Sequence, residues 1–251
     1  MRSTIFAVAV ALLAAVSLAG CGGGSDANTL RVGTEGTYSP FSFQGTDGKL
    51  TGYDVEVVQA VGAKLGKKVE FVQTPWDAIF AALEAKRFDL VANQVTINAE
   101  RKAKYDLSEP YTISKGVIVT RSDNTDITSL ADLKGKTTAQ TTTSNWAGVA
   151  RNAGANVEGV EGFVQAVQLL KDGRVDATVN DTLAVAEYQK VRGDGAVKIA
   201  GSTGDTSQQA FAARKDSGLM PDVNRALDEL RADGTLKRIS EKYFGSDVSG
   251  P

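Results

Sequence analysis

Short apolar runs alternate along this chain with longer segments in which apolar residues recur every three or four positions. The first pattern is typical of buried strands and the second of helices with one buried face. Strands and helices that alternate at this spacing predict parallel βαβ units, and therefore an α/β fold. Strands are expected at 30–34, 68–73, 88–92, 116–120, 136–140, 155–160, 175–181, 197–201 and 209–213. Helices are expected at 54–66, from 75 onward, and at 146–152, 163–173, 182–191, 220–232 and 236–244.

Turn and cap signals add detail near the start of the chain. The segment 45–48, Gly-Thr-Asp-Gly, separates two short apolar stretches and predicts a β-hairpin. Asp54 precedes a stretch with helical periodicity and is expected to cap that helix. Pro75 is a residue that helices favour at their start. The pattern gives two βα series, with a tail that returns after the second.

The first twenty residues have the pattern of a removed export signal, because Arg2 supplies a charge, residues 5–18 an apolar core, and small residues follow. This run is too short and too early for a good membrane span. Leu-Ala-Gly-Cys at 18–21 resembles a bacterial lipobox, which predicts cleavage before Cys21 and lipidation of its thiol. The alternative is an unmodified cysteine near an ordinary cleavage site. We expect a signal peptide at 1–20 and a lipidated flexible tether at 21–29.

The composition excludes several classes of function. The 251 residues include 28 basic and 30 acidic ones, and this net charge of −2 lacks the electrostatic signature of a nucleic-acid-binding protein. Histidine is absent and the only cysteine is Cys21, so nucleophile–histidine pairs and His/Cys metal sites are excluded. The sequence contains no Asp-rich calcium loop. We therefore expect neither a cofactor nor a metal ion.

Polar residues follow the apolar run at 88–92, in the stretch Asn-Gln-Val-Thr-Ile-Asn-Ala-Glu-Arg at 93–101. Ligands of α/β proteins gather at the carboxyl ends of parallel strands, so this stretch is the first candidate for a binding site. Arg101 has a planar, permanently charged fork that fits a carboxylate, and Thr96 adds a hydroxyl and a backbone N–H. Such a set suits a small zwitterion. The alternative is a loop after a strand, with a solvated arginine.

Seven motifs follow one another along the chain: LRVGTEGTYSPFSF, TGYDVEVV, QTPWDAIFAAL, TINAER, YDLSEPY, GRVDATVND and DGTLKRISEKYFG. Each is loose alone, but their order and spacing together resemble the extracytoplasmic solute-binding proteins of polar amino-acid ABC importers, family 3. The resemblance covers essentially the whole chain after the expected signal. It implies a type II periplasmic-binding-protein-like fold, in which two α/β lobes are joined by two crossing strands and close on the ligand.

The two crossings of such a fold are expected near 111–116 and 206–209. This placement assigns residues 30–113 together with 209–247 to one lobe. Residues 114–208 then form the other lobe, and the C-terminal tail rejoins the first.

The resemblance also implies a site for the two charged ends of an amino acid. Arg101 is similar to the family's α-carboxylate clamp, aided by Thr96 and by the N–H groups of the turn at Thr143 and Ser144. That turn lies at an expected helix N-terminus, where free N–H groups favour an anion. A simple capping role for either residue is an alternative that does not conflict. Asp181 is similar to the partner of the α-ammonium group; the alternative is an N-cap of the helix that follows.

Five further residues complete the implied site. The Gln94 backbone is expected to assist at the ammonium group, together with the threonine hydroxyl two residues later. Tyr38 and Trp76 match the family's aromatic walls, although an aromatic residue at such a place is otherwise more often part of a core. Glu35 matches a position that meets the distal end of polar ligands. Gln140 lies where relatives carry a residue that reads the ligand side chain.

One departure from the family pattern narrows the choice of ligand. Many relatives have Ala-Gly before the Val-Thr-Ile stretch, whereas this chain has Asn93 and Gln94. Together with TTAQTTTSNW and VEGVEGFVQAV, this feature resembles the L-cystine-binding branch and puts glutamine, arginine and histidine specificity in doubt. The extra amides can hydrogen-bond the second zwitterion of a disulfide-linked ligand, and Glu35 can meet its second ammonium group.

The expected protein is a monomeric lipoprotein on the periplasmic side of the bacterial cell membrane. It is expected to bind L-cystine or a related polar amino acid by lobe closure, and to deliver it to the permease of an ABC transporter. We expect it not to be an enzyme and not to bind nucleic acid. The rival is a cyclohexadienyl (prephenate/arogenate) dehydratase on the same fold, with Glu35 as the acid. A sensor ectodomain is disfavoured, because the printed sequence shows no later apolar span and no signalling domain.

Overall fold

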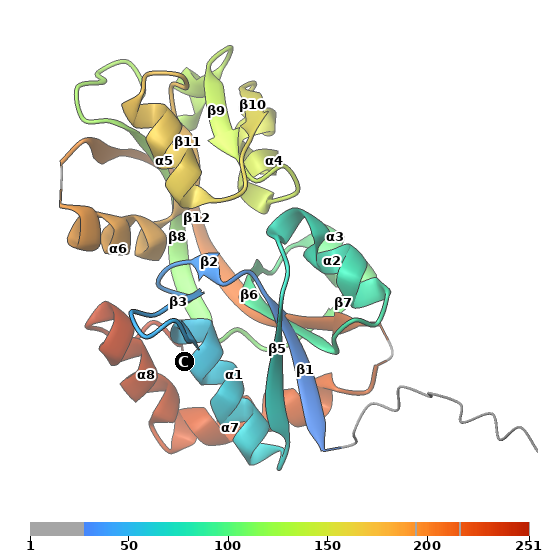
Figure 1. Ribbon diagram of the computed structural model, residues 1–251. Coiled ribbons are helices and arrows are strands. Elements are labelled where there is room, and N and C mark those ends of the chain that lie inside the picture. Colours follow the sequence, from blue (N-terminus) through green and yellow to red (C-terminus); the bar gives the residue numbers. More distant parts are fainter. Residues whose placement is uncertain (1–27, 194, 216, 251) are drawn as a thin grey trace, which may run out of the picture.

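The computed structural model in Figure 1 describes residues 28–193, 195–215 and 217–250. The expected export signal, the lipidation site Cys21 and the tether as far as residue 27 lie outside these residues. The described chain has the α/β class that the sequence predicts, with its elements gathered into two groups. We call the group that contains β1 lobe 1 and the group that contains β9 lobe 2.

A seven-stranded sheet forms the centre of the molecule, in the order β11-β8-β12-β6-β1-β5, with β7 paired to β12. Its β1 pairs in parallel with both β5 and β6, as the βαβ pattern predicts. By contrast, β12 pairs antiparallel with β6, β7 and β8, and β11 pairs antiparallel with β8. The strands are β1 (Thr29–Thr34), β5 (Lys68–Gln73), β6 (Leu90–Thr96), β7 (Tyr105–Leu107), β8 (Thr112–Arg121), β11 (Thr178–Asp181) and β12 (Val197–Arg214).

Helices cover this sheet in both lobes (Figure 1). In lobe 1, α1 and the C-terminal helices pack together on one side, and the predicted hairpin is present as a three-stranded sheet. Lobe 2 contains a parallel pair of short strands. Lobe 1 includes β2 (Thr37–Tyr38), β3 (Ser42–Gln44), β4 (Leu50–Thr51), α1 (Tyr53–Lys64), α2 (Trp76–Glu84), α3 (Ala99–Lys104), α7 (Met220–Ala232) and α8 (Thr235–Phe244). Lobe 2 includes η1 (Leu130–Leu133), β9 (Thr137–Gln140), α4 (Asn145–Asn152), β10 (Asn156–Gly159), α5 (Phe163–Lys171) and α6 (Thr182–Arg192).

Strands β8 and β12 connect the two lobes (Figure 1). They are hydrogen-bonded neighbours from the pair Val197–Arg121 to the pair Gln209–Thr112. The two strands predicted at 197–201 and 209–213 are therefore one continuous strand of 18 residues. The polar segment between them stays in the strand, because Ser202 and residues 206–208 pair with β8; residues 203–205 form an irregularity between these pairs.

The start of α1 also differs from the prediction. Asp54 does not cap this helix, because Gly52 occupies the N-cap position and Asp54 lies inside the first turn. A side chain at position 52 would meet the carbonyl oxygen of Phe41 at 2.2 Å, and the backbone there has φ of 133°. Glycine is the residue that tolerates both conditions. Asp54 is thereby placed in the protein interior, where it is fully buried.

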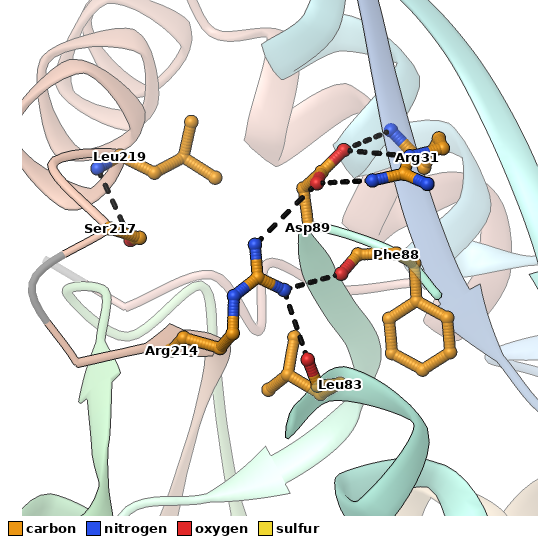
Figure 2. Close-up of polar contacts among 7 residues, drawn as sticks. All are labelled: Arg31, Leu83, Phe88, Asp89, Arg214, Ser217 and Leu219. Carbon is orange, nitrogen blue, oxygen red and sulfur yellow. Dashed lines mark hydrogen bonds and ion pairs between the residues drawn. The ribbon is translucent and has the colours of Figure 1, made fainter. Parts of the chain in front are cut away.

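An arginine near the end of β12 ties this strand to the outer end of lobe 1 (Figure 2). Arg214 Nη1 donates to the carbonyl oxygens of Leu83 and Phe88, at 3.0 and 2.6 Å. Its Nη2 lies 3.7 Å from Asp89, and Arg31 donates to the same carboxylate from the other side. Arg214 thereby supplies a donor to the Phe88 carbonyl, between α2 and β6, and a second donor to the Leu83 carbonyl, which also accepts the N–H of Lys86 at 3.0 Å.

Candidate functional site

A cavity of about 50 Å³ lies where the two lobes face each other. Both lobes contribute to its wall, and five residues of the predicted site line it: Glu35, Tyr38, Trp76, Asn93 and Gln94. The wall is completed by Thr37, Thr141, Asn145, Trp146, Gly162, Phe163 and Asn180. Tyr38 and Trp76, the aromatic residues predicted as walls, therefore line this cavity between the lobes.

Two polar contacts join the lobes around this cavity. The Tyr38 hydroxyl donates to Asn180 Oδ1 at 2.9 Å. The carboxylate of Asp77, in the first turn of α2, accepts four hydrogen bonds from Thr142 and Thr143 at 2.6–3.2 Å, two from N–H groups and two from hydroxyls. These bonds lower the pKa of Asp77 although desolvation acts the other way. The lobes are thus in contact in this structure.

Arg101 is a buried cation without an acidic partner among the described side-chain contacts. Only 7% of its surface is exposed, so the alternative of a solvated loop arginine is wrong. Its Nη1 donates to the backbone oxygen of Thr96 at 2.9 Å, and its guanidinium lies 5.1 Å from the Trp76 ring centre and 5.6 Å from that of Phe80. Burial lowers the pKa of Arg101 to about 10. A buried charge with one backbone acceptor favours an anion as a further partner.

The α3 helix begins where it does because Asn98 caps it, and this cap fixes the direction of the arginine. Asn98 Oδ1 accepts the N–H of Arg101 at 2.8 Å. Thr96 ends β6 just before this turn, and it lines a second, more open groove of about 920 Å³ beside the cavity. Asn145 and Trp146 line both the groove and the cavity.

Glu35 and Asn93 form one unit on the cavity wall. Asn93 Nδ2 donates to Glu35 Oε2 at 2.6 Å, and Asn93 Oδ1 accepts the backbone N–H of Glu35 at 2.9 Å and the Thr34 hydroxyl at 3.0 Å. Burial raises the pKa of Glu35 to about 7, even though these hydrogen bonds act in the opposite direction. The amide of Asn93 thus holds a carboxylate that faces a space without a cation among the described residues.

Asp181 is buried at the junction of β11 and α6. Its Oδ1 accepts the N–H of Leu183 at 2.8 Å, so the N-cap alternative is confirmed. Its Oδ2 accepts from the hydroxyl of Ser114 and, at 3.4 Å, from Gln209 Nε2. Burial raises the pKa of Asp181 to about 6. The cap uses one oxygen only, and no Lys or Arg is among the described hydrogen-bond partners of the other.

The turn before α4 does not present free N–H groups in this structure. The N–H of Thr143 is bound by Asp77, and the N–H of Ser144 donates to the carbonyl of Thr141 at 3.0 Å. Ser144 Oγ accepts the N–H of Ala147 at 3.1 Å, which confirms its capping role. Gln140 is buried at the end of β9 but does not line the cavity.

Sequence reasoning missed Asp77, Asn180 and Trp146 as members of this region. Asp77 has the signature of a solvated first-turn acid, so no local pattern indicates its contact with the other lobe. Asn180 directly precedes Asp181, where polar residues at a strand end are a usable signal. Trp146 follows the predicted turn before α4, and its ring packs against the backbone of Gly116 on β8.

The described ranges, 28–193, 195–215 and 217–250, contain no group of three or more acidic, histidine or cysteine side chains arranged to hold a metal ion. They also contain no helix that is both long enough and apolar enough to cross a membrane.

Arg101 and Asp181 are buried but line neither the cavity nor the groove. Two lobes joined by paired strands, with a polar cavity between them, define a binding protein that closes on a small solute. The family model of bacterial extracellular solute-binding proteins, family 3, matches residues 30–246. This chain belongs to that family. It is 51% identical to the L-cystine-binding protein TcyA of Bacillus subtilis, over 93% of this chain and 94% of that protein. It is 42% identical to the L-cystine-binding protein TcyJ of Escherichia coli K12, over 88% and 84%.

Solved structures agree with this assignment. An ancestral arginine-binding protein bound to arginine has a TM-score of 0.81 at 41% identity, covering 87% of this chain and 99% of that one. The L-cystine solute receptor of Neisseria gonorrhoeae, in its unliganded open conformation, has a TM-score of 0.60 at 46% identity, covering 89% and 95%. The more similar sequence thus has the lower TM-score. Such an order is expected when the lobes stand closer together here than in an open structure.

Proposed function

We propose that this solute-binding protein serves an amino-acid ABC transporter and binds L-cystine, or a related polar amino acid, between its lobes. The observation that carries the proposal is the buried guanidinium of Arg101, which has no acidic partner among the described residues. Two relatives with 51% and 42% identity are L-cystine-binding proteins, which supports this choice of ligand. Delivery to a membrane permease follows from the role of the family.

In the proposed site, the charges of the ligand meet their complements on opposite lobes. Arg101 and Thr96 from lobe 1 bind the α-carboxylate, and Asp181 from lobe 2 binds the α-ammonium group, aided by the Gln94 backbone. Because one ligand contacts both lobes, the closed conformation binds it better than an open one can. Thr143 and Ser144 act through closure and capping, since their N–H groups already have acceptors.

The remaining residues of the proposed site surround the rest of the ligand. Tyr38 and Trp76 exclude water from its aliphatic part. Glu35, held by Asn93, faces a second ammonium group, which L-cystine has and which most amino acids lack. Gln140 does not line the cavity, and its buried Nε2 has no hydrogen-bond partner among the described residues. Its assignment to the ligand side chain rests on the family resemblance.

We further propose the division of the chain that the sequence suggests, with residues 30–113 and 209–247 in lobe 1 and 114–208 in lobe 2. The position of β8 and β12 between the lobes supports it. The export signal at 1–20 and a lipid anchor at Cys21 remain proposals that rest on sequence alone. They would place the protein, as a monomer, on the outer face of the cytoplasmic membrane.

Isothermal titration with L-cystine tests the proposed ligand, together with a thermal-shift screen of the other amino acids. A ligand at a hundred times its Kd adds about 2.7 kcal/mol to the free energy of unfolding. We expect a clear rise in melting temperature with L-cystine. A protein that responds to no amino acid would contradict the proposal.

We propose that the chain is not an enzyme. One structural relative, with 36% identity and a TM-score of 0.79, is an ancestral amino-acid-binding protein described as a precursor of cyclohexadienyl dehydratase. Because of that relative, cyclohexadienyl dehydratase activity is the alternative to be tested, with Glu35 as the acid. Incubation with prephenate or arogenate decides between them, and we expect no turnover.

A further inference from the structure

The side-chain amide of Gln94 has a fixed orientation. Its Nε2 donates to Asp54 Oδ1 at 2.6 Å and to the Thr112 hydroxyl at 3.1 Å, so both N–H bonds are used. The backbone N–H of Gln94 donates to Asp54 Oδ2 at 2.8 Å. Both oxygens of Asp54 thus accept from Gln94, although burial raises the pKa of this carboxyl to about 7. In its ionised form Asp54 only accepts hydrogen bonds, so the amide oxygen does not take the place of the nitrogen. Oε1 must therefore point away from Asp54.

The backbone of Gln94 adopts a conformation that residues with a side chain seldom use. Its φ is 50°, in the left-handed region, and Lys86 is the other non-glycine residue in that region among the described ones. Such a conformation is unfavourable unless neighbouring groups hold it. Asp54 supplies that hold, because it binds the backbone and the side chain of Gln94 at once.

The oxygen of Gln94 is a buried acceptor that no described group satisfies. Gln94 is 8% exposed, its Oε1 has no hydrogen-bond partner among the described residues, and the residue lines the cavity together with Glu35. A buried carbonyl oxygen without a partner is unfavourable, and an N–H donor of a ligand would relieve this cost.

A related arrangement occurs at the aspartate that we assign to the α-ammonium group. Gln209 Nε2 donates to the hydroxyls of Ser207 and Ser114 at 2.8 and 3.1 Å and lies 3.4 Å from Asp181, and Gln209 Oε1 has no partner among the described groups. In both places hydroxyl and carboxylate oxygens surround the amide nitrogen, and the amide oxygen has no partner among the described groups. Of the two glutamines, only Gln94 lines the cavity.

We propose that Gln94 determines specificity by accepting a hydrogen bond from the second ammonium group of the ligand, and that Asp54 is the positioning residue that aims its oxygen. This inference rests on the proposed function. It adds a neutral acceptor to the cavity wall that also contains the carboxylate of Glu35, so the second ammonium group has two acceptors. Neither Glu35 nor Asp54 has a Lys or Arg among its described hydrogen-bond partners, which favours a cationic group from the ligand.

The test compares L-cystine with S-(methylthio)-L-cysteine, which keeps the disulfide and the first zwitterion but lacks the second. Gln94→Gly removes the acceptor and suits the left-handed backbone, so it is expected to fold. We expect this variant to bind L-cystine about tenfold more weakly, and the shorter ligand with unchanged affinity. Lys86→Gly makes the same backbone change at an exposed site, and it should leave both affinities unchanged.

Asp54→Asn tests the positioning role, because it removes the charge that fixes the amide. It should lower the affinity for L-cystine more than that for the shorter ligand; if it does not fold, Gln94→Gly decides alone. Unchanged L-cystine affinity in Gln94→Gly, or an equal loss for both ligands, would overturn the inference while leaving the proposed function in place. Failure of the unaltered protein to bind L-cystine would overturn both.

Discussion

The carboxylate of Asp77 binds both the N–H and the hydroxyl of Thr143, at 2.9 and 2.6 Å, and so joins lobe 1 to lobe 2. Neither residue lines the cavity, so this contact can persist when a ligand is bound. We expect Asp77→Ala to open the unliganded protein, which small-angle scattering would detect as a larger radius of gyration. Because the closed, binding-competent conformation is then less populated, the affinity for ligand should fall about fivefold.

Asp132 provides a matched control for this experiment. It also accepts four hydrogen bonds from two neighbouring residues, Thr128 and Ser129, but all of them lie within lobe 2. Asp132→Ala should therefore lower stability without changing the radius of gyration or the affinity. If Asp77→Ala leaves the unliganded shape unchanged, Asp77 does not contribute to closure.

Arg101→Ala should cost about 3 kcal/mol or more of binding free energy, roughly two decades of affinity, because it leaves the ligand carboxylate buried without its cation. Titration calorimetry with L-cystine measures this loss. Arg101→Lys keeps the charge but not the planar fork, so it should recover only part of the affinity. A near wild-type titration by Arg101→Ala would refute the assignment of this residue to the carboxylate.

Ligand binding should release protons. Burial raises the pKa of Glu35 to about 7 and that of Asp181 to about 6, both above the usual carboxyl values near 4. Between about pH 4 and 7 the unliganded folded protein thus holds more protons than the unfolded chain, and its stability decreases as the pH rises. Ammonium groups favour the ionised carboxylates, so affinity for L-cystine should rise at least tenfold from pH 5 to pH 7.

Titration in buffers with different ionisation enthalpies measures this proton release directly. Burial also raises the pKa of Asp54 to about 7, so three buried carboxyls can take part. Glu35→Gln removes one of them, so fewer protons should be released near pH 7 and the rise in affinity should be smaller. An affinity that does not change with pH would show that these carboxylates do not meet the ligand's charge.

Arg214 should matter for stability and not for binding, because neither it nor the partners drawn in Figure 2 line the cavity. Arg214→Met removes the donor to the Phe88 carbonyl and one of two donors to the Leu83 carbonyl, and should lower the free energy of unfolding by about 2 kcal/mol. Arg31→Met breaks a more exposed pair with Asp89 and should cost less than about 1 kcal/mol. Urea denaturation measures the stability of both variants. A loss of L-cystine affinity in either one would contradict the prediction that these arginines affect stability alone.

The periodic pattern predicts the fold well where one face of an element is buried against the core. The strands β1 and β5 and the helices α7 and α8 match their predicted ranges closely, because apolar spacing decides them. The continuous course of β12 could not be predicted in this way. Its polar middle segment is paired through backbone groups with β8, and that pairing leaves no mark in the side-chain pattern.

The candidate site shows the same limit. Tyr38 and Trp76 could be assigned to the cavity wall by resemblance, and the structure places both there. The contact of Asp77 with the other lobe, and the hold of Asp54 on Gln94, depend on residues far apart in sequence. Asp54 was expected as a helix cap because its local sequence fits that role, and only the close approach of Gly52 to the chain before it moves the cap by two residues.

The paired course of β8 and β12 restricts how the lobes can move. Two hydrogen-bonded strands form a ribbon that bends and twists easily but resists sliding of one strand along the other. The lobes should therefore swing about the ribbon as a hinge, without shear. Each time the lobes close, Tyr38 then contacts Asn180 and Asp77 contacts Thr143 in the same alignment. The connection between the lobes thus serves as a mechanical guide that makes closure repeatable from one transport cycle to the next.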